Sequence, residues 1–282
     1  MSMIARSLAA LGPHGFHRLA YWEWPGPPAA PTVLCLHGLT RNGRDFDVLA
    51  ETLSASYRVV APDMPGRGQS EWLKEPADYG YPVYLADTAA LIARLGVERL
   101  DLVGTSMGGI IGMFLASMPG SPIGRLVIND VGPLIAKEGV ARIGTYVGED
   151  PSFADLAGLE AALRVRAASF GPLSDAQWRH LATISARTKP DGALGFAYDA
   201  HIADAFRAAP AADIDLWPQW DAIRCPTLVL RGAQSDLLRV EDAQAMTRRG
   251  PKAGLVEFSG VGHAPALMAA DQIAAIRDFL LG

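Results

Sequence analysis

Hydrophobic residues along the chain group into short, nearly continuous runs that end in turn or polar residues. Runs of this kind, in place of strict alternation with polar residues, are typical of strands buried on both faces of a parallel sheet. The pattern predicts such strands at Thr32–His37, Tyr57–Asp63, Arg99–Gly104, Arg125–Asp130, Thr227–Gly232 and Gly254–Ser259. Before them, Phe16–Trp24 is expected to form an antiparallel hairpin arm at the edge of the sheet.

Segments whose apolar residues have helical spacing lie between several of these strands. Tyr84, Thr88, Leu91 and Leu95 recur at steps of three and four residues on one helix face, and Gly96 stands where a helix stop belongs. The segment Ile273–Leu280 repeats this spacing near the C-terminus. The alternation of strands and helices predicts an α/β protein with a doubly wound, mostly parallel sheet.

This alternation of strands and helices is interrupted between residues 131 and 220. The segment is rich in Ala, Leu and Arg, has helical spacing with Gly/Pro punctuation, and contains no convincing strand. A helical cap inserted into one sheet, after the sixth recognised sheet element, is the simplest account. We therefore expect a core of residues 1–130 and 221–282, with a helical cap formed by residues 131–220.

Composition narrows the class of protein and its partners. Half of the 282 residues are hydrophobic and the net charge is only −5, which suits a large buried core and excludes disorder as the main state. The lack of a Lys/Arg block argues against nucleic acid or an anionic membrane as partner, and no apolar run reaches the roughly 18 residues of a membrane span. Two cysteines are too few for a disulfide framework, and the first twelve residues lack a signal-peptide pattern. We expect a cytoplasmic monomer or homodimer.

The motif with the clearest chemical meaning is Gly104-Thr-Ser106-Met-Gly108, which lies where a predicted strand ends and a helix-forming run begins. A nucleophile elbow needs this arrangement, because its serine sits in a strained, tight turn where flanking side chains would clash. The start of the helix also offers free N–H groups beside the position of a developing oxyanion. Ser106 is therefore the candidate nucleophile.

A serine hydroxyl is a poor nucleophile at neutral pH and needs a positioned base, which an acid in turn orients. The best candidate base is His263, which follows the last predicted strand. We expect Asp236, just after the strand Thr227–Gly232, to be the acid, because the order Ser, Asp, His is typical of this arrangement. Asp130, at the end of the strand before the cap, is the alternative acid; otherwise it caps that strand or anchors the cap.

The loop after the first central strand is expected to complete the site. The N–H of Leu39 is placed to pair with that of Met107 as an oxyanion hole. His37, next to this loop, is expected to hold the loop in place and not to act as a second base.

The candidate substrate-binding residues are Arg41, after the oxyanion loop, and Tyr146 and Trp178 in the cap. An apolar cap over the serine would exclude water and select the acyl group. An arginine in the cap would be able to bind a substrate carboxylate through two hydrogen bonds. Any single cap residue can equally belong to a solvated helix face or to an internal ion pair.

At this point the sequence resembles the α/β-hydrolase superfamily, specifically its cap-bearing serine hydrolases. The resemblance rests on the segments Leu36–Phe46, Asp63–Ser70, Gly104–Gly109, Asn129–Pro133, Arg231–Asp236 and Gly260–Pro265. It implies hydrolysis of a small or medium ester, thioester or lactone through an acyl-enzyme on Ser106, with no cofactor and no metal. The substrate itself stays open, because one fold hosts many chemistries.

Two alternative functions remain. Hydrolases of ring-fission products, which split carbon–carbon bonds, resemble the chain around Ser106, but their oxyanion loop usually reads H-G-x-G-P-G where this chain has His37-Gly-Leu-Thr-Arg-Asn42. Dehalogenases and epoxide hydrolases of this fold carry an aspartate nucleophile and are disfavoured by Ser106. A non-catalytic ligand receptor on the same scaffold is the remote alternative, since such proteins usually have a damaged triad. Esterases and enol-lactone hydrolases fit best.

Overall fold

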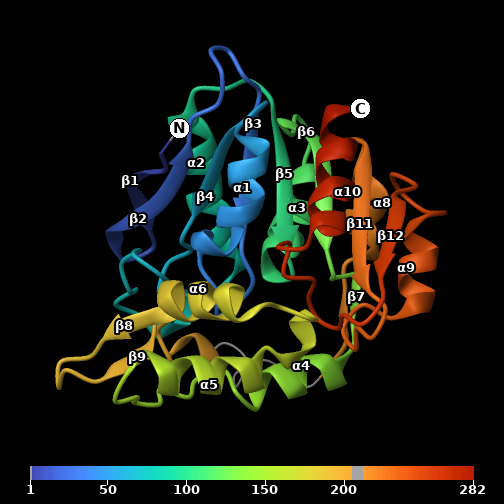
Figure 1. The fold of residues 1–282 in the computed structure, drawn as a ribbon. Helices are drawn as coiled ribbons and strands as arrows, with labels where there is room; N and C mark the ends of the chain where they lie inside the picture. The colour runs from blue at the N-terminus through green and yellow to red at the C-terminus, as the bar shows by residue number, and fades with distance from the viewer. Residues whose placement is uncertain (1, 205–211) are drawn as a thin grey trace.

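A computed structural model of the protein describes residues 2–204 and 212–282. Its centre is an eight-stranded sheet with the order β1-β2-β4-β3-β5-β6-β11-β12 (Figure 1). The first two strands form an antiparallel hairpin, β2 runs antiparallel to β4, and the remaining neighbours are parallel. The strands are β1 (Ile4–Gly12), β2 (Gly15–Trp24), β3 (Thr32–Leu36), β4 (Arg58–Pro62), β5 (Leu100–Thr105), β6 (Ile123–Asn129), β11 (Thr227–Gly232) and β12 (Gly254–Phe258).

Helices cover both faces of the sheet, which makes the prediction of a doubly wound α/β fold correct. One face carries α2 (Tyr81–Leu95), α3 (Met107–Ser117), α8 (Trp217–Ala222) and α9 (Val240–Met246). The other face carries α1 (Asp47–Leu53) and α10 (Ala270–Leu281), and two 3-10 turns, η1 (Gly43–Phe46) and η2 (Pro76–Asp78), lie in the loops.

The central strands show why their apolar runs are continuous. In β3, Val33 and Cys35 pack with the α1 and α10 side of the core, whereas Leu34 and Leu36 pack with the α2 and α3 side. All four side chains are fully buried, so each side of the strand needs apolar residues. Cys35 is a free thiol, as is Cys225.

The predictions at the sheet edge and at α2 are also confirmed, with one strand missed. The arm predicted at Phe16–Trp24 is β2, and Gly96 ends α2 in the left-handed conformation, with φ of 68°. Its hairpin partner β1 was not predicted, because a mostly exposed edge strand carries little apolar pattern. No helix among the residues described is long and apolar enough to cross a membrane.

Between β6 and β11 the chain forms a cap below the lower edge of the sheet (Figure 1). Its helical elements are α4 (Lys137–Gly144), α5 (Leu156–Arg166), η3 (Ala168–Phe170) and α6 (Asp175–Ser185). The expectation of no strand in this segment is wrong. Two antiparallel ribbons occur, β8 (Ala186–Thr188) with β9 (Leu194–Phe196) and β7 (Leu134–Ile135) with β10 (Ile214–Asp215). Strands of two or three residues are too short to produce a recognisable pattern.

The ribbon of β7 and β10 joins the two ends of the cap. Ile214 pairs with Ile135, and the Leu216 N–H donates to the Pro133 carbonyl oxygen over 2.6 Å. The cap is therefore tied at its base, where it leaves and re-enters the core.

Candidate active site

Ser106 sits in a sharp turn between β5 and α3, as expected for a nucleophile elbow. Its φ of 52° and ψ of −114° are strained for a residue with a side chain. The turn is possible because its neighbours are glycines. A Cβ on Gly108 would lie 2.0 Å from the Leu36 carbonyl oxygen, and one on Gly104 would lie 2.3 Å from the Gly108 carbonyl oxygen. Glycine at both positions thus lets the start of α3 approach β3.

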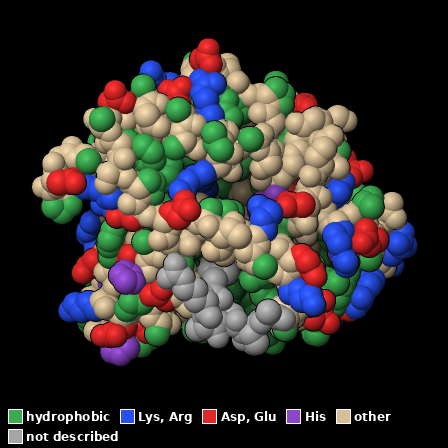
Figure 2. All heavy atoms as spheres, turned by 90° about the horizontal axis from the view of Figure 1, so that it is seen from below, with side chains coloured by type: hydrophobic (Ala, Val, Ile, Leu, Met, Phe, Trp, Pro, Cys, Tyr) green, Lys and Arg blue, Asp and Glu red, His purple; other side chains and the backbone are tan. Residues whose placement is uncertain are grey.

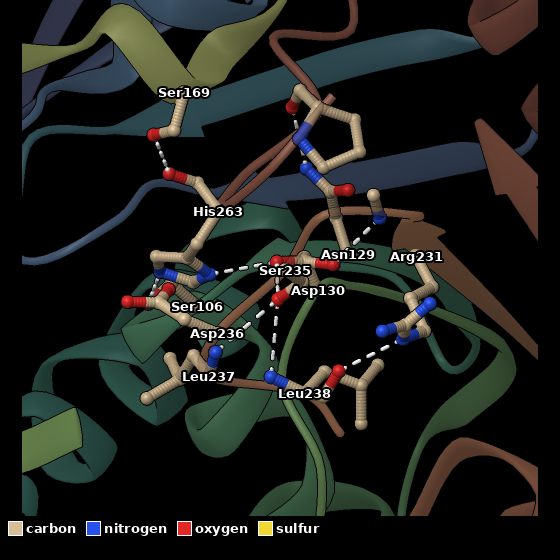
Figure 3. A network of polar contacts seen from close by, with 12 residues as sticks. Ser106, Asn129, Asp130, Ser169, Arg231, Ser235, Asp236, Leu237, Leu238 and His263 are labelled. Atoms are coloured by element: carbon tan, nitrogen blue, oxygen red, sulfur yellow. Dashed lines mark hydrogen bonds and ion pairs between the residues drawn. The ribbon is translucent and has the colours of Figure 1, made fainter. Parts of the chain in front are cut away.

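The structure brings His263 to Ser106. The His263 Nε2 lies 3.0 Å from the Ser106 Oγ, and its Nδ1 lies 2.8 Å from the Asp130 Oδ2 (Figure 3). A carboxylate only accepts, so the Nδ1–H donates to Asp130 and the Nε2 lone pair faces the serine hydroxyl. The three side chains form one continuous hydrogen-bonded chain.

Asp130 is held in place by the loop after β11. It is fully buried and has a φ of 59°, directly after β6 ends. The Gly232 N–H donates to its Oδ1 over 2.8 Å, and the Ser235 hydroxyl donates to its Oδ2 over 2.6 Å (Figure 3). Together with His263 these contacts fix the carboxylate in one orientation.

The expectation that Asp236 orients the histidine is therefore wrong. Among the residues described, Asp130 and not Asp236 contacts the His263 Nδ1, and the Asp236 Oδ2 lies 2.5 Å from the Nε of Arg142 in the cap. Its side chain is 54% exposed, whereas that of Asp130 is fully buried. The loop after β11 turns so that Ser235, and not its neighbour Asp236, faces the site.

Two further residues hold the histidine loop, and no local pattern in the sequence indicates their roles. The Asn129 side-chain amide donates to the Thr105 hydroxyl over 3.1 Å and to the Pro265 carbonyl oxygen over 2.9 Å. From the cap, the Ser169 hydroxyl donates to the His263 carbonyl oxygen (Figure 3). The loop is thus held from β6 on one side and from the cap on the other.

The two expected oxyanion donors come from the start of α3 and from the loop after β3. Met107 is the first residue of α3, so its N–H has no acceptor within the helix. Leu39 follows β3, and its carbonyl oxygen accepts a hydrogen bond from the buried Arg67 over 2.8 Å. Arg67 also lies 3.8 Å from the Met107 sulfur, so one guanidinium contacts both donor residues.

His37 has the structural role expected of it. Its Nδ1 contacts the Gly38 carbonyl oxygen at 2.7 Å, and its Nε2 accepts from the Met64 N–H at 2.9 Å. The imidazole is therefore neutral, with its proton on Nδ1. Burial lowers the pKa of His37 to about 3, which keeps it neutral.

A pocket of about 120 Å³, partly open to solvent, lies between the cap and the Ser106 and His263 side chains. Arg41 and Tyr146 are among its lining residues, but the Arg41 guanidinium is bound by Asp45 and Ser185. Trp178 does not belong to the described lining; it is buried in the cap, with the Arg164 guanidinium 5.5 Å from its ring. The expectation that Trp178 contacts substrate is therefore wrong. Among the residues described, no group of three or more His, Cys, Asp or Glu side chains is placed to hold a metal ion.

Comparisons with known proteins show the family to which the chain belongs. Residues 33–276 match the model of the alpha/beta hydrolase family. A 3-hydroxybutyrate-oligomer hydrolase of Cupriavidus necator is 47% identical, with 96% of each chain covered.

Solved structures of hydrolases are similar to this protein over nearly its whole length. An alpha/beta hydrolase of Novosphingobium aromaticivorans is 38% identical and superposes with a TM-score of 0.89, covering 99% of this chain and 98% of that one. An E-2-(acetamidomethylene)succinate hydrolase is 25% identical, with a TM-score of 0.85 and both chains fully covered. The protein belongs to the alpha/beta hydrolase family and is a hydrolase that acts on ester bonds.

Proposed function

We propose that the protein hydrolyses esters through an acyl-enzyme on Ser106, with His263 as base and Asp130 as the residue that orients it. The observation that carries this proposal is the unbroken hydrogen-bond chain from the Ser106 Oγ through both ring nitrogens of His263 to the Asp130 carboxylate. Each ring nitrogen of His263 faces the partner that the mechanism requires of it.

The reaction follows from the positions of these atoms. The His263 Nε2 takes the proton of the Ser106 hydroxyl, and the Oγ attacks the ester carbonyl carbon. The N–H groups of Leu39 and Met107 stabilise the oxyanion of the tetrahedral intermediate. His263 then protonates the leaving alcohol. In the second half of the reaction His263 takes a proton from a water molecule, which attacks the acyl-enzyme and releases the acid and the free Ser106.

The proposed substrates are short oligomers of a hydroxy acid of the 3-hydroxybutyrate type. The relative that is named for such oligomers matches this chain over nearly its whole length, cap included. Each repeat of such an oligomer is a small branched ester, which suits a pocket lined by Leu39, Ile143 and Phe170 beside the serine.

The test combines a chemical probe with a substrate series. A fluorophosphonate, which reacts with activated serines, is expected to add one adduct that maps to Ser106 by mass spectrometry. The variant Ser106→Ala is expected to remain folded, take up no adduct and lose at least about a thousandfold in kcat.

The wild-type enzyme is then assayed with p-nitrophenyl butyrate, a 3-hydroxybutyrate dimer, a lactone and a vinylogous diketo acid. Turnover of the dimer and of p-nitrophenyl butyrate is the expected result. Folded protein without an adduct would contradict the serine mechanism, and turnover of the diketo acid alone would contradict ester hydrolysis.

A further inference from the structure

The charged side chains that line the active-site pocket are all of one sign. Among its described lining residues, three are arginines, Arg41, Arg142 and Arg166, and none is Asp or Glu. The outer surface on the cap side differs, because acidic and basic side chains are mixed across it (Figure 2). An all-cationic lining favours a substrate that carries a negative charge.

Arg41 is fully engaged by the protein itself. Its Nε and Nη2 bind the two carboxylate oxygens of Asp45 at 2.8 and 2.6 Å, and its Nη1 donates to the Ser185 hydroxyl over 2.8 Å. All three nitrogens are therefore occupied, and Arg41 connects the core to the end of α6. It is not a candidate for binding substrate.

Arg166, at the end of α5, is held against the pocket wall by aromatic side chains. Its guanidinium lies 4.7 Å from the Phe196 ring centroid, and its Nη1 lies 3.3 Å from the Tyr198 hydroxyl. Phe196 and Tyr198 line the same pocket. Its acidic partner Glu149 is more than half exposed and lies outside the pocket lining. The Arg166 Nε has no hydrogen-bond partner among the described residues.

Arg142 approaches the same space from α4. Its Nε and Nη2 contact the two carboxylate oxygens of Asp236 at 2.5 and 3.1 Å, and Asp236 is outside the lining. Unlike the largely buried Arg41–Asp45 pair, this pair is exposed, at 41% for Arg142 and 54% for Asp236.

Tyr146 lies between the two arginines: burial raises the pKa of its hydroxyl, the positive charges of Arg142 and Arg166 act against that rise, and the negative charge of Asp236 adds to it. The two guanidinium groups therefore lie within electrostatic reach of one phenol. Both acidic partners are more than half exposed, so water screens each ion pair and the pairs contribute little to stability. A substrate carboxylate can therefore compete for either arginine.

We propose that Arg142 and Arg166 form an anion subsite that binds the free carboxylate of an ester substrate. The inference rests on the proposed function, because it places the scissile ester at Ser106. In a hydroxy-acid dimer the carboxylate belongs to the leaving hydroxy acid, close to the scissile bond. The fork of an arginine matches a carboxylate geometrically, so the subsite selects acidic esters and places the terminal ester bond at the serine.

The wild-type enzyme provides the first test. Its kcat/KM is measured for the 3-hydroxybutyrate dimer as a free acid and for the same dimer with its carboxylate converted to a primary amide. Both molecules contain the same scissile ester and differ in charge. A kcat/KM at least about tenfold higher for the free acid is expected, carried by KM, since hydrogen bonds to charged groups are the stronger ones. Equal values would overturn the subsite.

Variants then assign the effect to the arginines. Arg166→Gln and Arg142→Gln are each expected to raise KM for the free acid about tenfold, while the amide and p-nitrophenyl butyrate change by less than about twofold. Arg166→Lys keeps the charge and is expected to recover part of the loss. The matched control is Arg164→Gln on the same helix, whose arginine pairs with Glu160 and Asp175 away from the pocket.

The outcomes separate this inference from the proposed function. A parallel loss on p-nitrophenyl butyrate would show that the arginines only support the pocket, and it would overturn the subsite. The same holds if the Gln variants keep the wild-type preference for the free acid. Failure of the proposed function gives a different result, because no ester is then hydrolysed and Ser106 takes up no fluorophosphonate.

Discussion

The hydroxyl of Ser169, in the cap, donates a hydrogen bond of 2.5 Å to the main-chain carbonyl oxygen of His263. In return, the Gly262 N–H donates to the Ser169 carbonyl oxygen over 2.7 Å. The loop that carries the candidate base is therefore held by the cap as well as by the sheet. A residue that only roofs the pocket would not make these contacts.

Ser169→Ala is expected to lower kcat for p-nitrophenyl butyrate roughly three- to tenfold, because one hydrogen bond that positions the base is lost. KM is expected to change less. The rate of fluorophosphonate labelling of Ser106 should fall in proportion to kcat, which a loss of stability alone would not cause. An unchanged labelling rate together with a lower Tm would contradict this positioning role.

Asp130→Asn is expected to lower kcat about ten thousandfold, because an amide at this position favours the wrong tautomer of His263. Asp236→Asn is the matched control, since it changes the same chemical group at an exposed ion pair. We expect it to alter kcat by less than about threefold for a neutral ester. The reverse order of effects in steady-state assays would restore Asp236 as the acid.

Gly108→Ala is expected to destabilise the protein by about 3 kcal/mol or more, because the added Cβ would lie 2.0 Å from the Leu36 carbonyl oxygen and force α3 away from β3. Gly144→Ala, at the end of α4, is the control. A Cβ there meets nothing within 4 Å, so a change of no more than about 1 kcal/mol, in the stabilising direction, is expected. Urea unfolding measures both values, and equal effects would contradict the packing argument.

His37 gives the folded state a predictable dependence on pH. Burial lowers its pKa to about 3, against about 6.5 in the unfolded chain, so the unfolded state binds one more proton between these values. From this residue alone, the free energy of unfolding is therefore expected to fall by about 1.4 kcal/mol for each unit by which the pH is lowered from 6 to 4.

The control for this effect is His37→Asn, which keeps a donor but does not titrate. In urea unfolding across this pH range, its slope should be smaller than that of the wild type by about one proton. Identical slopes would show that His37 is protonated in the folded state.

The elbow and the histidine could be predicted from sequence because their signals are local. Gly104 and Gly108 flank Ser106 in the chain, and His263 directly follows a strand pattern. The choice between Asp130 and Asp236 is different in kind, because both satisfy the order Ser, Asp, His. It depends on how the loop after β11 packs against β6, and on Arg142 of the cap, 94 residues before Asp236. Contacts over such separations leave no trace in local spacing.

In the cap, too, local patterns indicate position along the chain but not side-chain contacts. Its place in the chain could be predicted because the strand rhythm stops there. The prediction for Trp178 rests on its residue type alone, but its side chain is buried inside the cap. Ser169, for which no sequence pattern predicts a role, contacts the main chain of His263. Which cap side chains face the pocket is decided by the packing of α4, α5 and α6 on one another, and helical spacing alone does not determine it.

The short ribbon of β7 and β10 has a consequence for how this protein diversifies. Because it brings the two ends of the cap together, an insertion or deletion between β7 and β10 need not change the spacing of β6 and β11 in the sheet. Ser169 limits this freedom, because it holds the loop of His263 from the cap. Cap positions that leave Ser169 and its contacts in place are therefore those at which substrate preference can change while the candidate base keeps its position.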